Sequence, residues 1–216
     1  RQPVVSRHGL AATVAWGRNG QTYYGLEGNI NYAGAVIEWL IHRAGLLTSA
    51  DEAEALALQA APADRTVFVP AFTGLGAPHW APEMRAAIVG MGSTTGRAEI
   101  VRAAVDSIAY QVTDVLRAMA EDVGQPAAQL FCDGGAVRNS YLMQRQSELL
   151  RSVIRVAENQ DGSCAGAAKM AGEAAGLYGG DTVFGAWQRE YRPQQSAAWA
   201  EAEYGRWQSA VKQIKG

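Results

Sequence analysis

The 216-residue sequence lacks most of the features that mark a specialised class of protein. Its two cysteines, Cys132 and Cys164, are too few for a disulfide framework and favour a reducing, cytoplasmic setting. It contains no signal peptide and no apolar run long enough to span a bilayer. The formal net charge of −2 gives no reason to expect a nucleic acid or an anionic membrane as a partner.

Familiar catalytic and metal-binding motifs are missing as well. The three histidines, His8, His42 and His79, are far apart and lack ligand spacing, so we predict no metal site. No G-x-S-x-G elbow, Walker A loop or H-E-x-x-H helix occurs. The proportions of hydrophobic residues (48%) and charged residues (19%) are ordinary for a soluble globular protein, and the length suits one domain.

Hydrophobic periodicity and turn residues predict a mixed α/β domain. The strands alternate with helices in the second half of the chain, which favours a mixed sheet flanked by helices. The periodicity of Val101, Val105, Ile108, Val112 and Val115 makes the helix over 97–121 the clearest one. The predicted elements are a hairpin over 10–28 with an Asn19-Gly20 turn, strands over 66–70, 86–91, 130–132 and 153–158, and helices over 33–44, 49–60, 97–121, 138–150, 163–176 and 200–214.

The stretch LFCDGGAVRNSYLMQ (130–144) is the first candidate for a binding site. A strand that runs into Gly134-Gly135 and then a helix can bring backbone close to a phosphate, and the helix start offers free N–H groups. The same pattern is also common in turns that are only tight connections. Asn139 can cap the following helix or contact a base or ribose, and on the residues alone the cap is favoured.

Two other features have both a structural and a functional interpretation. The stretch SCAGAAKMAGEAAG (163–176) is so rich in small residues that another backbone, or a flat ring, could lie against it. Close packing on a sheet is the favoured explanation, and the two interpretations are compatible. His79 lies in a Gly/Pro-rich loop over 70–82, where a lone histidine is more often a surface or packing residue than a catalyst.

Four longer stretches together resemble the C-terminal half of the FGGY carbohydrate kinases. They are YYGLEGNINYAGAVIEWL, VPAFTGLGAPHWAP, AAIVGMGSTTGRAEIVRAAVDSIAYQVTDVL and FCDGGAVRNSYLMQ. The second of them is similar to a segment typical of the glycerol kinase branch. The likeness runs from about residue 9 to the C-terminus. Ala81 and Ala86 depart from the Asp and Gly that are usual at these positions.

The resemblance implies a fold and an activity. The fold would be the ribonuclease-H-like domain of actin, hexokinase and Hsp70-type ATPases, with residues 1–216 as the C-terminal nucleotide-binding domain. The complete enzyme would transfer the γ-phosphoryl group of Mg²⁺-ATP to a polyol hydroxyl, with ATP and Mg²⁺ as cofactors. The polyol would be bound mainly by an N-terminal domain absent from this chain. A homo-oligomer is also expected.

The resemblance further implies nucleotide-binding roles for Gly34, Glu38, Gly135 and Asn139. Gly34 would face the phosphate or ribose side, Gly135 would pass close to the phosphates, and Asn139 would contact the adenosine end. The small helix that starts near Ser163 would pack behind the Gly135 loop. The family often has Gln where this chain has Glu38, and a carboxylate accepts hydrogen bonds without donating them.

The resemblance places the rest of the catalytic machinery upstream. The family's catalytic base is an Asp in a Gly-Asp-Gln segment, followed by a Gly-Thr-Gly strand, and neither segment is in this sequence. We therefore name no catalytic residue and no metal ligand here. The absent strand would lie between the hairpin and the strand ending at Cys132, and its loss would leave two unpaired edges. The chain begins with Arg1, and we expect it to be the tail of a longer polypeptide, or to be completed by another chain, and to be inactive alone.

Three functions fit these expectations. The first is a part of an ATP-dependent glycerol kinase. The second is a part of another FGGY sugar kinase, for xylulose, ribulose or another polyol. The third is a nucleotide-binding module without catalysis, which Glu38 and the missing base would suit.

Overall fold

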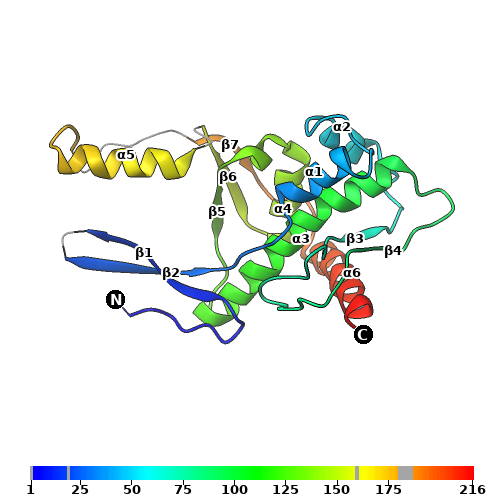
Figure 1. Ribbon diagram of the computed structural model, residues 1–216, viewed down its shortest axis with the longest axis horizontal. Coiled ribbons are helices and arrows are strands. Elements are labelled where there is room, and N and C mark those ends of the chain that lie inside the picture. The colour runs from blue at the N-terminus through cyan, green and yellow to red at the C-terminus, as the bar shows by residue number, and fades with distance from the viewer. Residues whose placement is uncertain (1, 19, 159–160, 180–186) are drawn as a thin grey trace.

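The computed structural model describes residues 2–18, 20–158, 161–179 and 187–216. Helices and strands alternate along the chain, as Figure 1 shows. In chain order the elements are β1 (Ala11–Arg18), β2 (Gln21–Glu27), α1 (Gly34–His42), α2 (Glu52–Gln59), β3 (Val67–Val69), β4 (Ala87–Val89), α3 (Arg97–Val123), β5 (Gln129–Cys132), the 3₁₀ turn η1 (Gly135–Arg138), α4 (Ser140–Leu150), β6 (Val153–Ala157), α5 (Gly162–Ala174), β7 (Trp187–Tyr191) and α6 (Ala197–Lys215).

Helix α3 is the centre of the body of the molecule. Its apolar positions, spaced by three and four residues, are buried, Val101 and Val105 completely. The helix ends where Gly124 takes the left-handed conformation (φ +83°), as the sequence predicts. Helices α1, α2, α4 and α6 and strand β3 surround it in one hydrophobic core. Trp207 of α6 is fully buried there and stacks on Tyr110 of α3, with 5.4 Å between ring centroids.

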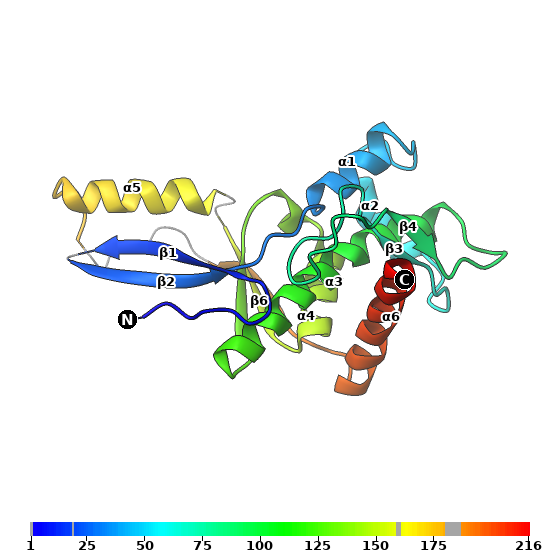
Figure 2. The same ribbon diagram turned by 60° about the horizontal axis from the view of Figure 1, so that its bottom comes forward.

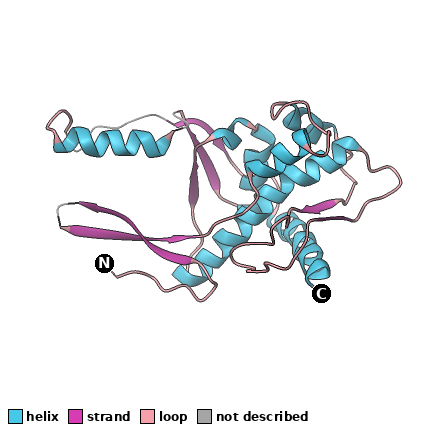
Figure 3. Cartoon of the chain, in the orientation of Figure 1, coloured by secondary structure: helices cyan, strands magenta, loops and turns pink. Residues whose placement is uncertain are grey.

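The strands form three separate small sheets (Figure 3). Strands β1 and β2 make an antiparallel hairpin, and β3 and β4 make a second antiparallel pair. The third sheet is mixed, because β5 runs parallel to β6 and β7 runs antiparallel to it. The predicted mixed sheet is thus present, and β7 is an additional strand that the sequence did not predict. Within the described residues, β5 pairs with β6 alone, and its other edge is open.

The hairpin and α5 project from the body and form what we call the arm (β1, β2 and α5; Figures 1 and 2). Most of the hairpin is open to solvent, since seven of the eight residues of β1 are exposed. The rings of Trp16 and Tyr23 stack on each other, with 3.9 Å between their centroids. Arg18 of β1 and Glu173 of α5 form an ion pair at 3.0 Å. Asn19, one half of the predicted turn, lies outside the described residues.

Helix α5 does not take the position expected for it. Its small residues were expected to pack behind the Gly135 loop, but the helix extends away from that loop beside the hairpin. Only its first residue returns toward the turn, where the Gly162 N–H donates to the Asp133 carboxylate at 3.1 Å. Gly172 is the single buried residue of α5, and the ring of Tyr178 lies directly over it. The expectation fails because α5 lies along the hairpin, where Arg18 pairs with Glu173, and not along β5.

The N-terminal segment is tied to the far end of α3. Asp122 accepts hydrogen bonds from the Ser6 hydroxyl and from the backbone N–H of Arg7. These bonds, together with His8, lower the pKa of Asp122 to about 2. A small second cluster of Leu10, Ala77, Val115 and Ala118 packs beneath this contact. The base of the hairpin is therefore attached to the same helix that forms the core. None of the helices in the described part of the chain has both the length and the apolar composition needed to cross a bilayer.

Candidate functional site

A cavity of about 510 Å³ opens between α1, the start of α2, the middle of α3 and the η1–α4 turn. This volume lies in the range of small-molecule sites. Apolar side chains form much of its wall, with Ile37 from α1, Val105 and Ile108 from α3 and Leu142 from α4. This one cavity is lined by all four candidate residues, Gly34, Glu38, Gly135 and Asn139. They come from two segments that lie about 100 residues apart in the chain.

Two glycines leave space at opposite walls. A Cβ atom built at Gly34 or at Gly135 would meet nothing within 4 Å, so neither glycine is required by packing inside the protein. The missing side chains instead keep both surfaces open to a bound molecule. Gly134 differs from them, because its backbone has φ +86° and ψ −179°, a region that only glycine visits readily.

These glycines should respond differently to substitution by alanine. We expect Gly134→Ala to lower the free energy of unfolding by about 1–3 kcal/mol, because alanine is strained at this φ and ψ. Gly135→Ala should change it by less than about 0.5 kcal/mol, because its Cβ projects into open space. Urea denaturation of the natural polypeptide measures both. Equal losses for the two variants would show that this turn has another conformation.

The structure corrects the expected start of the helix after the Asp-Gly-Gly turn. The sequence predicted a helix from about residue 138, but a 3₁₀ turn comes first and α4 begins at Ser140. Two of the N–H groups at its start are occupied. Asn139 Oδ1 accepts from Leu142 N at 2.9 Å, and Glu54 Oε2 accepts from Ser140 N at 2.9 Å. Asn139 is therefore the N-cap that the residues alone favoured, and the same residue lines the cavity.

Glu54 is a residue of the cavity that the sequence analysis missed. It is half-buried, and its carboxylate joins α2 to the first turn of α4. Its position on a short, Ala-rich helix gave no signal, because the partner N–H lies 86 residues away in the chain. Asp51 and Arg138 also line the cavity and were not singled out.

Glu38 lies at the exposed rim of α1. Its Oε2 is 3.1 Å from Nε2 of His42, one helical turn later, and its side chain is 64% exposed. Because Glu38 follows Gly34 by four residues, the two share a face of the helix. The carboxylate thus stands at the edge of the open surface that Gly34 leaves.

A buried ionic cluster lies behind the cavity and fixes α4 against α3. Arg145 of α4 lies 3.1 Å from Asp106 of α3 and also bonds Glu203 of α6. The Tyr141 hydroxyl donates to Asp106 at 2.9 Å. Burial raises the pKa of Asp106 despite Arg145. Burial alone would also raise the pKa of Glu203, but Arg145 and Arg206 together hold it below its usual value.

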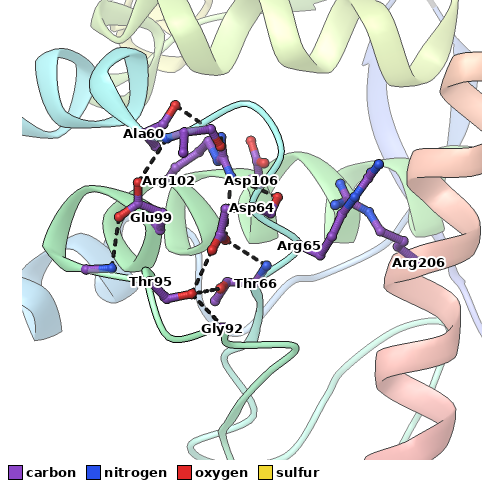
Figure 4. A network of polar contacts seen from close by, with 12 residues as sticks. Ala60, Asp64, Arg65, Thr66, Gly92, Thr95, Glu99, Arg102, Asp106 and Arg206 are labelled. Atoms are coloured by element: carbon purple, nitrogen blue, oxygen red, sulfur yellow. Dashed lines mark hydrogen bonds and ion pairs between the residues drawn. The ribbon is translucent and has the colours of Figure 1, made fainter.

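A second polar network fixes the start of α3 (Figure 4). Glu99 accepts from the backbone N–H groups of Ala61 and Gly96, each at 2.9 Å, and these bonds lower its pKa. Asp64 accepts from the Thr95 hydroxyl at 2.6 Å and from Thr66 N at 2.9 Å. The network joins the loop after α2 to the N-terminus of α3. It therefore fixes the relative position of α2 and α3, which both line the cavity.

His79 is a structural residue, as the sequence favoured. Its Nε2 lies 2.7 Å from Oδ2 of the buried Asp114 in α3. The Tyr204 hydroxyl and the Trp207 indole N–H donate to the same carboxylate, at 2.6 and 2.7 Å. Burial and then the Asp114 carboxylate raise the pKa of Tyr204. The Gly/Pro loop, α3 and α6 therefore meet at Asp114.

Neither cysteine is paired, and no metal cluster is found in the described ranges. Cys132 is half-buried at the end of β5, where burial and the neighbouring Asp133 raise its pKa to about 11, and Cys164 is exposed. Across residues 2–18, 20–158, 161–179 and 187–216, no three His, Cys, Asp or Glu side chains gather as a metal site would require.

Comparison with known proteins shows the family. The model described as "FGGY family of carbohydrate kinases, C-terminal domain" matches residues 1–175. The chain belongs to the FGGY family. The glycerol kinase of Alkalilimnicola ehrlichii is 42% identical over 215 residues, which are 100% of this chain and 43% of that relative. The glycerol kinase of Acinetobacter baylyi is 40% identical over 97% of this chain and 43% of its own length.

Solved structures of related kinases superpose closely on this FGGY chain. The crystal structure of Plasmodium falciparum glycerol kinase with ADP superposes with a TM-score of 0.88 at 28% identity, over 98% of this chain and 43% of that one. Gluconate kinase from Lactobacillus acidophilus gives a TM-score of 0.83 at 19% identity, over 100% of this chain and 44% of that one, which shows the fold alone. The ribonuclease-H-like fold class of actin and hexokinase is confirmed. The chain spans less than half the length of the relatives it matches.

Proposed function

We propose that this FGGY chain is the C-terminal, nucleotide-binding part of a glycerol kinase, which converts ATP and glycerol to ADP and glycerol 3-phosphate. The observation that carries the proposal is the single cavity that Gly34, Glu38, Gly135 and Asn139 line. The choice of glycerol rests on the relatives, because glycerol kinases match this chain at about 40% identity.

The cavity suits a nucleotide physically. A flat base would lie between the apolar side chains of Ile37, Val105 and Leu142, and the open surfaces at Gly34 and Gly135 would let it approach the backbone. The triphosphate would leave on the Gly135 side, because carboxylates line the α1–α2 side. Mg²⁺ would be held by phosphate oxygens and water together with ligands from outside the described residues.

We also propose that a segment preceding Arg1 completes the sheet and supplies the catalytic base and the polyol site. Three observations support this: the relatives are more than twice as long as the chain, β5 has an open edge, and the hairpin pairs only with itself in the described chain. Large apolar side chains are exposed on the hairpin, on β5 and on α5 and the residues that follow it, namely Val14, Trp16, Tyr24, Phe131, Met170 and Leu177. Such a surface is typical of one that another element covers.

Compartment and assembly complete the proposal. The two free thiols, Cys132 and Cys164, fit a reducing compartment such as the cytoplasm. A homo-oligomer stays a prediction, and the mass of the natural polypeptide in solution, measured by light scattering, tests it.

The activity itself can be tested with two polypeptides. The natural full-length polypeptide should consume ATP when glycerol is added, whereas residues 1–216 alone should consume none. In the full-length protein, Gly135→Val should weaken ADP binding by at least about tenfold, because the side chain fills the cavity wall. Its unfolding temperature should change little, because a Cβ atom at this position meets no atom of the protein within 4 Å.

Three outcomes would change the conclusion. Activity with xylulose or ribulose in place of glycerol would assign the chain to another FGGY sugar kinase. ADP binding without turnover of any polyol would favour a module without catalysis. Turnover by residues 1–216 alone would show that no further segment is needed.

A further inference from the structure

The two polar walls of the cavity differ in hydrogen-bonding character. The wall formed by α1 and α2 carries three carboxylates, Glu38, Asp51 and Glu54. The facing wall, formed by η1 and the start of α4, carries Arg138 and the amide of Asn139. Ionised carboxylates accept hydrogen bonds and cannot donate them, whereas a guanidinium only donates. The cavity is therefore polarised across its width.

The contacts within the protein reinforce this polarity. The side-chain oxygen of Asn139 is occupied by Leu142 N at 2.9 Å, so the group that Asn139 can offer to the cavity is its NH₂ donor. Glu54 holds Ser140 N at 2.9 Å and is fixed in place. Glu38 has one oxygen 3.1 Å from His42 Nε2, which leaves its other oxygen to accept a bond from a bound molecule.

The position of Glu38 on α1 distinguishes it from the carboxylates of Asp51 and Glu54. Gly34 and Glu38 lie one turn apart on the same face, and Gly34 leaves open space above the helix. A flat ring that lies over Gly34 would therefore present its edge to Glu38. Asp51 lies at the N-terminal end of α2, and Glu54 is committed to α4.

We propose that this wall selects a nucleobase that presents an amino group rather than a carbonyl group, and that Glu38 is the residue that discriminates. The inference rests on the proposed function, since it requires a nucleotide in the cavity. An amino group donates to the carboxylate. A carbonyl oxygen at the same place would set one acceptor against another, so the carbonyl would lose a bond to water without replacing it.

Adenine and hypoxanthine provide a matched pair for this question. They have the same ring system and nearly the same size, but adenine has an amino group at position 6 and an unprotonated N1, where hypoxanthine has a carbonyl oxygen and an N1–H. Sites that depend on a hydrogen bond discriminate strongly against an analogue that cannot make it. ATP should therefore bind more tightly than ITP, the corresponding nucleotide of hypoxanthine.

The test measures the dissociation constants of ATP and ITP for the natural full-length polypeptide by calorimetry. We expect the wild-type protein to prefer ATP by about 100-fold. Glu38→Gln should reduce this preference to about tenfold, because the amide can rotate and donate to the carbonyl. Glu83→Gln, which makes the same chemical change at an exposed residue outside the cavity lining, should leave the preference unchanged.

The results separate this inference from the proposed function. If wild type and Glu38→Gln both bind ATP with the same preference over ITP, Glu38 does not face the base edge and the inference is wrong, while the nucleotide site stands. A wild-type protein that binds ITP as well as ATP also overturns it. If the wild-type protein binds neither nucleotide, the cavity is not a nucleotide site and both proposals fall. A merely structural role for Glu38 would weaken both nucleotides equally and leave their ratio unchanged.

Discussion

Replacing Asp114 by alanine is expected to lower the free energy of unfolding by about 3–5 kcal/mol. The carboxylate is buried and accepts three hydrogen bonds, from His79, Tyr204 and Trp207. Its removal leaves the fully buried Trp207 N–H without its partner and takes one partner from the Tyr204 hydroxyl, which also interacts with Gln208. An unsatisfied buried donor costs about 1–3 kcal/mol. The loss should be large because the Gly/Pro loop, α3 and α6 are held together at this point.

Urea denaturation of the natural polypeptide measures the effect, and Trp207→Phe serves as its control. Phenylalanine removes one of the three donors and keeps an aromatic ring beside Tyr110, so we expect a loss of about 1–2 kcal/mol. A loss below about 1 kcal/mol for Asp114→Ala would mean that the donors find other partners. The Asp114 cluster would then not be what holds α6 to the body.

Replacing Arg145 by methionine should lower the free energy of unfolding by about 3–5 kcal/mol at pH 7, because it leaves the buried Asp106 carboxylate without its paired cation. Glu203 loses one of its cations and keeps Arg206. Arg145 is 11% exposed and pairs with Asp106 and Glu203, which are 8% and 9% exposed. Methionine has a similar length, so the volume is largely kept and the charge is what changes. The cluster connects α3, α4 and α6, and all three helices should therefore lose stability together.

The loss should be smaller at pH 5 than at pH 7. In the wild type the lowered pKa of Glu203 adds stability above its unfolded-state pKa, and this stability is lost as the pH falls through the folded-state value. The raised pKa of Asp106 acts in the opposite direction. Without Arg145 both pKa values rise, so lower pH protonates the unpaired Asp106 carboxylate in particular and relieves the cost of its burial.

Arg155→Met provides the matched control for Arg145→Met. Arg155 pairs with Glu190 at 3.0 Å, but the two side chains are 35% and 33% exposed. We expect a loss below about 1 kcal/mol, because water screens an exposed pair. Denaturation curves at both pH values measure the two variants. An equal loss for Arg145→Met at pH 5 and pH 7 would show that packing, and not charge, explains its effect.

Local sequence patterns predicted the elements well where one physical signal dominated. The 3,4-spaced apolar residues of α3 and the Gly124 stop gave its position to within two residues at its C-terminal end. Strand β7 was missed because its sequence, WQREY, carries charges at successive positions, and its place in the sheet depends on β6. The separation of the hairpin from the mixed sheet follows from long-range pairing, which no local pattern encodes.

In the candidate site too, residues with a local sequence signal were predicted, and residues whose role depends on long-range contacts were not. The residues alone marked the Gly134-Gly135 turn and Asn139, because glycine pairs and Asx caps have local signatures. The family resemblance added Gly34 and Glu38, and the structure brings all four candidate residues to one cavity. Glu54 could not be found in this way, because its role depends on a backbone N–H in another helix. The error for α5 arose because a small-residue stripe shows that close packing is possible without showing against what.

The length of α3 has a mechanical consequence. At 27 residues the helix is about 40 Å long, and it carries Val105 and Ile108 in the cavity wall and Asp122 at its far end. Asp122 accepts hydrogen bonds from Ser6 and Arg7, in the segment that leads into the hairpin. Asp122 lies about 25 Å along the helix from Val105, so a tilt of about 3° at the cavity would displace it by about 1 Å. One continuous helix thus connects the wall of the cavity to the segment that leads into the hairpin.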